Sequence, residues 1–147
     1  MTHGKNGKTN SMEREFTEYT EALELEELGF DEPCLKYVWN DKKHSQWMHN
    51  SSGSRTYHHQ KEFTENSKIF TISVPTYQQA FRWFREKYGL FVAPNVISYE
   101  GDPYLWFFEI NSIMLAFGTD LGQTDDYKTY EEAELACLVK LIEIIKK

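Results

Sequence analysis

The sequence has 147 residues, of which 40% are apolar, 27% are charged and 16% are aromatic. This length is enough for one domain with a real hydrophobic core, and the sequence has no run of about 18 apolar residues that would predict a membrane span. The formal net charge of −7 argues against non-specific nucleic-acid binding, which requires a concentrated positive field.

The first segment, residues 1–11, is polar and rich in Gly, Asn and Lys, and we expect it to be a flexible tail. It has no apolar core of the kind that defines a signal peptide. We therefore expect a single domain over residues 12–147 and a location in the cytoplasm of the cell that makes the protein.

Three helices are predicted from apolar spacing and from start and stop signals. The first runs from Glu13 to Leu28, where Gly29 predicts a Schellman-type end with Phe30 over the last turn. Its glutamates predict a solvated face, with an acidic docking surface as the alternative. The second helix follows Pro75 and ends at Gly89. The third begins with a capping box at Thr129.

Strands are predicted between these helices from alternating apolar residues. Before the second helix they cover Cys34–Trp39 and Lys68–Val74, with shorter candidates at Gln46–His49 and Arg55–His59. After it they cover three segments, Phe91–Tyr99, Tyr104–Ile110 and Ile113–Phe117, followed by a polar loop over 118–128.

Two features refine this second group of strands. Pro94 indicates an edge strand or a bulge. The near-continuous apolar run YLWFFEI, which begins at Tyr104, indicates burial on both faces or one aromatic face left exposed. The predicted fold class is α+β, a two-layer sandwich in the order α-β-β-β-α-β-β-β-α with antiparallel strands.

The second helix carries the candidate binding residues. Its apolar face consists of Tyr77, Ala80, Phe81, Phe84 and Tyr88. Three polar residues lie beside that face, namely Gln78, Arg82 and Arg85. One aromatic residue, Trp83, points away from it. Trp and Arg are enriched at interface hot spots, and two arginines can bind a carboxylate or phosphate. Trp83 is either an exposed anchor or covered by another element.

Metal and catalytic chemistry has weaker support. Four histidines lie within sixteen residues, His44, His49, His58 and His59, but their spacing matches no zinc signature. We expect loop histidines there, no metal site and no cofactor. No nucleophile motif of the GxSxG kind is present. Cys34 and Cys137 form no CxxC pair, and we expect both thiols to be free and buried.

Three blocks of sequence together resemble a family of uncharacterised short proteins from Bacteroides-type gut bacteria and their phages. They are EALELEELGFDEPC (21–34), PTYQQAFRWFREKYGL (75–90) and YKTYEEAELACLVKLIEIIKK (127–147), and they cover about a third of the chain. The resemblance implies a phage or prophage origin and an intracellular setting. It implies no activity and no site residues.

The leading hypothesis is a small non-enzymatic phage accessory protein that binds a host or phage protein. Self-association through an aromatic face is a variant of this hypothesis. The alternative is a small-ligand or nucleotide-binding protein, in which aromatic rings stack a base and Arg82 or Arg85 holds a phosphate. An enzyme ranks third because no catalytic motif supports it.

Overall fold

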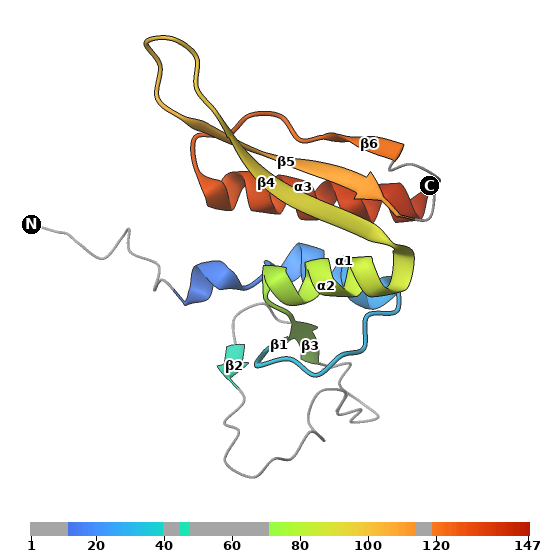
Figure 1. Cartoon of the computed structure of the whole chain (residues 1–147). Coiled ribbons are helices and arrows are strands. Elements are labelled where there is room, and N and C mark those ends of the chain that lie inside the picture. The colour runs from blue at the N-terminus through green and yellow to red at the C-terminus, as the bar shows by residue number, and fades with distance from the viewer. Residues whose placement is uncertain (1–11, 40–44, 48–70, 114–118) are drawn as a thin grey trace, which may run out of the picture. The chain divides into compact units, whose positions relative to one another are not determined.

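The computed structural model describes residues 12–39, 45–47, 71–113 and 119–147 (Figure 1). The helical elements are η1 (Glu13–Glu15), α1 (Tyr19–Glu27), α2 (Tyr77–Tyr88) and α3 (Tyr130–Lys146). The strands are β1 (Lys36–Trp39), β2 (Ser45–Trp47), β3 (Thr71–Val74), β4 (Leu90–Ile97), β5 (Leu105–Ser112) and β6 (Thr119–Gln123). They form two antiparallel sheets, in the orders β2-β1-β3 and β4-β5-β6. The predicted α+β class and its order of helices and strands are confirmed.

The chain divides into two compact units, residues 1–76 and 77–147, and each is described by itself. Each unit places helices against one three-stranded sheet. A single domain over residues 12–147 stays a prediction. The predicted tail, residues 1–11, and the strand candidate Arg55–His59 lie outside the described residues.

The first helix is shorter than predicted because the chain becomes extended at Phe16, which separates η1 from α1. Phe16 forms a bridge with Thr76. The buried Thr17 then donates both its backbone N–H, at 2.9 Å, and its hydroxyl, at 3.1 Å, to the carbonyl of Pro75. Threonine has modest helix propensity, so these two bonds outweigh helix continuation at this point.

The end of α1 matches the prediction. Gly29 has a φ of 98°, in the left-handed region that favours glycine. The N–H of Gly29 donates to the carbonyl of Glu26 at 3.0 Å, and the N–H of Phe30 donates to that of Leu25 at 2.9 Å. This is the pair of bonds of a Schellman motif. Phe30 and Leu25 are both buried.

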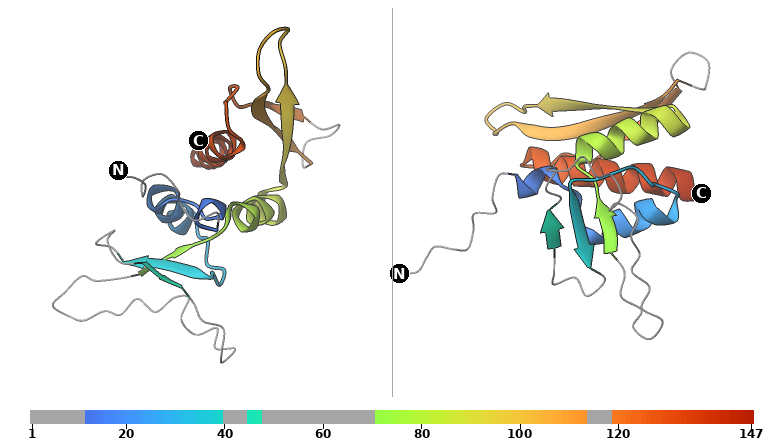
Figure 2. Two further views of the ribbon diagram at one scale, coloured as in Figure 1. Left: turned by 90° about the vertical axis from the view of Figure 1, so that its left-hand side faces the viewer. Right: turned by 90° about the horizontal axis from the view of Figure 1, so that it is seen from below.

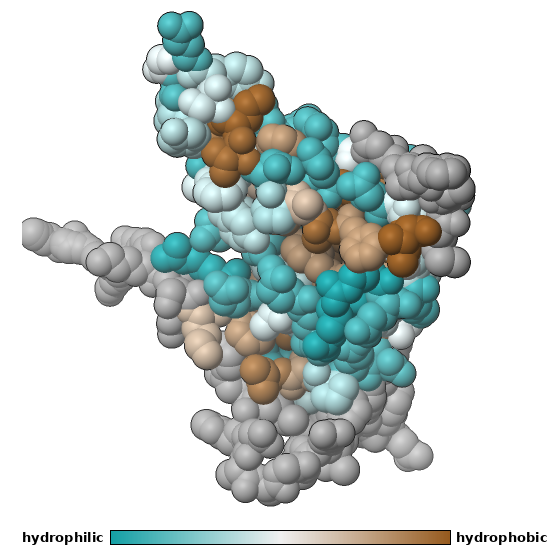
Figure 3. Space-filling model, in the orientation of Figure 1, coloured by the Kyte–Doolittle hydropathy of each residue, from teal (hydrophilic) through white to brown (hydrophobic). Residues whose placement is uncertain are grey.

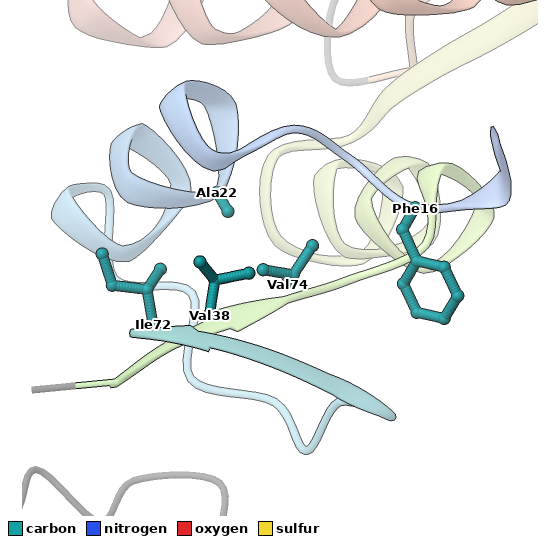
Figure 4. Close-up of a cluster of buried hydrophobic side chains, with 5 residues drawn as sticks. All are labelled: Phe16, Ala22, Val38, Ile72 and Val74. Carbon is teal, nitrogen blue, oxygen red and sulfur yellow. The ribbon is translucent and has the colours of Figure 1, made fainter. Parts of the chain in front are cut away.

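The core of the first unit lies between α1 and the β2-β1-β3 sheet (Figure 4). Val38 of β1 is the register partner of Ile72 of β3. With Val74, these side chains point from the sheet towards α1, and Ala22 points back towards them. Alternation along the strands places these residues on one face.

In the second unit, α2 buries the predicted face, with Tyr77, Ala80, Phe81 and Phe84 all buried. The helix ends at Gly89, whose φ is 68°. The Gly89 N–H donates to the carbonyl of Arg85 at 3.1 Å. This single bond and the positive φ define an αL-type end, from which the chain enters β4 directly.

Both helices of the second unit contact the same face of the β4-β5-β6 sheet. The Phe108 ring lies 5.9 Å from the Phe81 ring of α2 and 5.5 Å from the Tyr130 ring of α3, between centroids. Thr129 caps α3 as predicted, because its hydroxyl accepts from the N–H of Glu132 at 3.2 Å. The buried residues of α3 include Ile142, which the apolar spacing did not single out.

The polar loop predicted over residues 118–128 was wrong in part, because it contains the third strand of this sheet, β6. Of the strand predicted at Ile113–Phe117, Ile113 lies outside the strands and residues 114–117 lie outside the described residues. An edge strand needs only one bonded neighbour, so its polar composition is tolerated. A register shift opposite Glu109 and Asn111 and a φ of 105° at Gly122 accommodate the irregular pairing.

One carboxylate of α1 is buried with only partial hydrogen bonding. Glu21 is 8% exposed, and its Oε2 atom has no hydrogen-bond partner among the described residues. Loss of solvent around the carboxylate raises its pKa above the ordinary value of 4.5, and the nearby Glu18 and Glu24 raise the pKa further, although a backbone hydrogen bond opposes the rise.

Replacing Thr17 tests the contact that ends the first helix. Thr17→Val removes the hydroxyl bond to Pro75 with little change of shape, so the free energy of unfolding should fall by about 1 kcal/mol. The matched control is Thr20→Val, at an exposed position on α1. Urea unfolding followed by circular dichroism measures both. An equal effect of the two substitutions would contradict the structural role of Thr17.

Replacing Glu21 tests the cost of its buried charge. Because the folded pKa is raised, the favourable contribution of Glu21 is present below the unfolded pKa near 4.5 and is lost as pH rises through the folded pKa. Glu21→Gln should therefore gain stability over the wild type by about 1 kcal/mol at neutral pH and lose that advantage in acid. Chemical unfolding across this pH range, with the exposed Glu143→Gln as control, measures the difference. A gain that is constant with pH would exclude titration of Glu21 as its cause.

Candidate functional site

The structure separates the four candidate residues of α2 into two groups. Gln78, Arg82 and Arg85 are exposed, and their spacing of four and three residues places them on one flank of the helix. Trp83 is 6% exposed. Trp83 is therefore not an exposed anchor, while a binding role for the exposed flank stays a prediction.

Trp83 belongs to an aromatic cluster of its own helix. Its ring meets those of Phe84 and Tyr88 edge-on, with centroids 5.1 and 5.5 Å away. The ammonium of Lys87 lies 4.8 Å from the centroid of the Trp83 ring, in the range of a cation–π contact. These contacts indicate a packing role for Trp83.

The two cysteines have the properties of packed thiols. Both are free and buried, as expected. Burial, reinforced by the charge of Glu32, raises the pKa of Cys34 to about 12, and burial also raises the pKa of Cys137. Both thiols are protonated at neutral pH, which is the form that reacts poorly as a nucleophile or metal ligand.

The four histidines, His44, His49, His58 and His59, lie outside the described residues. Within the described ranges, no group of three or more His, Cys, Asp or Glu side chains could hold a metal ion. The expectation that the histidines occupy loops stays a prediction.

Exposed apolar side chains concentrate on the hairpin of β4 and β5 and at its ends. Six large hydrophobic residues are exposed in the described part of the chain, and four of them lie between residues 96 and 113. These are Val96 at 46%, Tyr99 at 49%, Tyr104 at 68% and Ile113 at 58% exposure. Single apolar side chains that are exposed at scattered positions are normal on protein surfaces. Four of them on one hairpin require an explanation.

Alternation along β5 divides its apolar run into two faces. Phe108 and Ile110 are buried on the inner face, and Trp106 on that face contacts Tyr130 of α3 at 5.3 Å between ring centroids. Leu105 and Phe107 point to the opposite, outer face. Their register partners on β4 are Ile97 and Asn95, and Phe91 follows on the same face.

The outer face carries no helix of this unit. Figure 2 shows α3 on the other side of the β4-β5 hairpin. The large apolar residues that β4 and β5 place on the outer face are all partly exposed, namely Phe91, Ile97, Leu105 and Phe107. In Figure 3 this side of the sheet shows brown apolar groups between teal polar ones. We call these four residues, together with the exposed Val96, Tyr99, Tyr104 and Ile113, the hairpin surface; it includes both faces of the hairpin, because Val96 lies opposite Trp106.

The tip of the hairpin is acidic. Trp106 and Tyr127 exchange two backbone hydrogen bonds, of 2.7 and 2.8 Å, which bring the segment before α3 beside the start of β5. The Tyr99 hydroxyl donates to Asp126 at 3.3 Å. Four exposed carboxylates lie in the two segments joined by these contacts, Glu100, Asp102, Asp125 and Asp126, and we call them the acidic end.

The signal for this site was present in the sequence but ambiguous. The run from Tyr104 to Ile110 allowed either two buried faces or one exposed face. The contacts of Trp106 and Phe108 with α3, together with the partial exposure of Leu105 and Phe107, favour the second arrangement. The spacing of residues along α2 pointed to Trp83 instead, because a helical wheel does not show what covers a residue.

Comparison with protein-family models, with curated proteins and with solved structures gives no match. Among the helices that the structure describes, none combines the length and apolar character needed to cross a membrane.

Substitutions on α2 distinguish packing from binding. Trp83→Ala should lower the free energy of unfolding by about 3–5 kcal/mol, as for other buried aromatics. Arg85→Ala, at an exposed position two residues further on, should change it by less than about 0.5 kcal/mol. Denaturant unfolding compares the two. A small effect of Trp83→Ala would mean that its ring is not part of the folded core.

Proposed function

We propose that this protein is a protein-binding module and that the hairpin surface is its recognition site. The observation that carries the proposal is the concentration of exposed large apolar side chains on one hairpin. Burial of apolar and aromatic groups drives most protein association. The adjoining acidic end is negatively charged, so it favours partners with a positively charged surface.

The composition of the surface suits an interface. Aromatic side chains are enriched where partners meet, and Tyr combines a large apolar ring with a hydroxyl that tolerates water. Tyr99 and Tyr104 flank the tip, whereas Phe91 and Phe107 lie along the strands. The centre is therefore apolar and the end polar, which is the usual anatomy of a transient interface.

The alternative of a small-ligand or nucleotide site loses part of its support. The two rings next to Arg82 in sequence, Phe81 and Trp83, are both buried and do not offer a face for stacking a base. The resemblance to phage-associated proteins adds a setting to the proposal: a host or phage protein as partner, in the bacterial cytoplasm. The proposal assigns no reaction and no cofactor to the chain.

Site-specific crosslinking tests this function in a Bacteroides-type host. A photoreactive phenylalanine analogue replaces Tyr104 in one variant and Leu35, which is 53% exposed in the other unit, in the control. We expect one adduct of defined mass from position 104 and none from position 35. Adding Val96→Ser to the first variant should reduce that adduct.

Two results would contradict the proposal. Adducts of the same mass and yield from both positions would show that capture depends on exposure alone. Failure of position 104 to give any adduct in the host would remove the support for a partner at the hairpin.

A further inference from the structure

Among the strands that the structure describes, none pairs with the outer edge of β4. We propose that an extended segment of the partner adds to the β4-β5-β6 sheet as a further antiparallel strand beside β4. This inference rests on the proposed function and specifies its mode of recognition. The segment carries apolar residues at alternate positions and a basic residue near its N-terminal end.

The register of the sheet shows which backbone groups β4 presents. Trp106 uses its N–H and carbonyl towards Tyr127, on the side away from β4. Its register partner on β4 is Val96, so the pair is not hydrogen-bonded and the N–H and carbonyl of Val96 point outward. In the same way, the N–H and carbonyl of Phe108 bond to Thr124 on the side of β5 away from β4. The carbonyl of Pro94, the register partner of Phe108, therefore also points outward.

Because the orientation of the backbone groups alternates along a strand, the N–H and carbonyl of Val92 also point outward. Within the described part of the chain, no hydrogen bond to a residue outside the sheet is found for the backbone of Val92 or Val96. An added strand would exchange two bonds with each valine and donate one to the Pro94 carbonyl. Backbone addition of this kind supplies affinity, and side-chain positions supply selectivity.

The other edge of this sheet suits a partner less well. The pairing of β6 with β5 is interrupted by a register shift, and Gly122 departs from extended geometry. The pairing of β4 with β5 runs without interruption over all eight residues of each strand. A regular, straight edge is the better template for an incoming strand.

Pro94 argues for a partner other than a second copy of the chain. In a symmetric pair of β4 strands with Val92 opposite Val96, the two Pro94 residues would face each other. Neither has an N–H, so two carbonyls would be left without donors. A different sequence places one N–H opposite Pro94 and avoids that loss.

Side chains along the edge indicate the partner's composition. Val96 is exposed on one face of β4, and Ile97 and Phe91 are partly exposed on the other. Apolar residues of the added strand would extend both of these surfaces. Because β4 runs towards the tip, an antiparallel partner begins beside the turn that carries Glu100 and Asp102 of the acidic end, where a Lys or Arg gains favourable charge contacts.

The test begins with selection from a random-sequence peptide library displayed on yeast, using the full chain as bait. The strongest binder is synthesised together with versions that carry one N-methylated amide each. We expect methylation to reduce affinity at every second position, by about tenfold where the amide faces β4. Hydrogen exchange should show new protection of the Val96 amide.

Protein variants provide the reciprocal test. Val96→Pro removes the outward donor at an edge position where proline is tolerated, whereas Val96→Thr keeps the donor and the approximate shape. The first should lose binding by about tenfold and the second should retain it. If Val96→Pro fails to fold, as judged by circular dichroism, the methylated peptides alone decide the outcome.

The outcomes separate the two proposals. A binder whose footprint lies on the hairpin surface, but which shows no alternate methylation effect and leaves the Val96 amide exchanging, overturns strand addition and keeps the proposed function. A selection that yields only binders outside the hairpin surface, or none, overturns both.

Discussion

The second unit depends on one geometric constraint, the alternation of side chains along β5. A run of apolar residues in a strand is always shared between two faces. In β5 that sharing assigns Trp106, Phe108 and Ile110 to the helices and leaves Leu105 and Phe107 on the other side. The two faces of β5 therefore contribute to different parts of the unit, one to its core and the other to its candidate recognition surface.

Backbone bonding imposes a similar division on the β4 strand. Each residue can direct its N–H and carbonyl to one side only, so residues bonded to β5 alternate with residues that face away. Proline is compatible only with the second kind of position, and Pro94 occupies one. The sequence signal that marked this strand as an edge thus agrees with the bonding that the structure shows.

Local signals in the sequence predicted most of the elements because their causes are local. Gly29 and Gly89 end helices through their own dihedral angles, and Thr129 caps α3 through its own hydroxyl. The division between η1 and α1 was missed because its cause, the carbonyl of Pro75, is distant in sequence. The strand β6 was missed because an edge strand with one bonded neighbour needs no apolar alternation.

The candidate site was less predictable than the fold for a related reason. Exposure of a residue depends on what covers it, and neighbouring residues in the sequence carry little information about that. Trp83 pointed away from the apolar face of its helix and is nevertheless buried, whereas Tyr104 lay in a strongly apolar run and is exposed. Composition indicated a surplus of aromatic residues, and the tertiary contacts determined which of them remain on the surface.

The contact between Thr17 and Pro75 has a consequence for the order of folding. It joins residues 58 positions apart, so the chain between them must close as a large loop before the bond can form. The pairing of β4 with β5 joins residues that are near neighbours in sequence and requires only a short turn. Loop closure becomes more costly in entropy with length, and contacts between distant residues slow folding. We therefore expect the β4-β5 hairpin to form early and the first unit to complete its structure later.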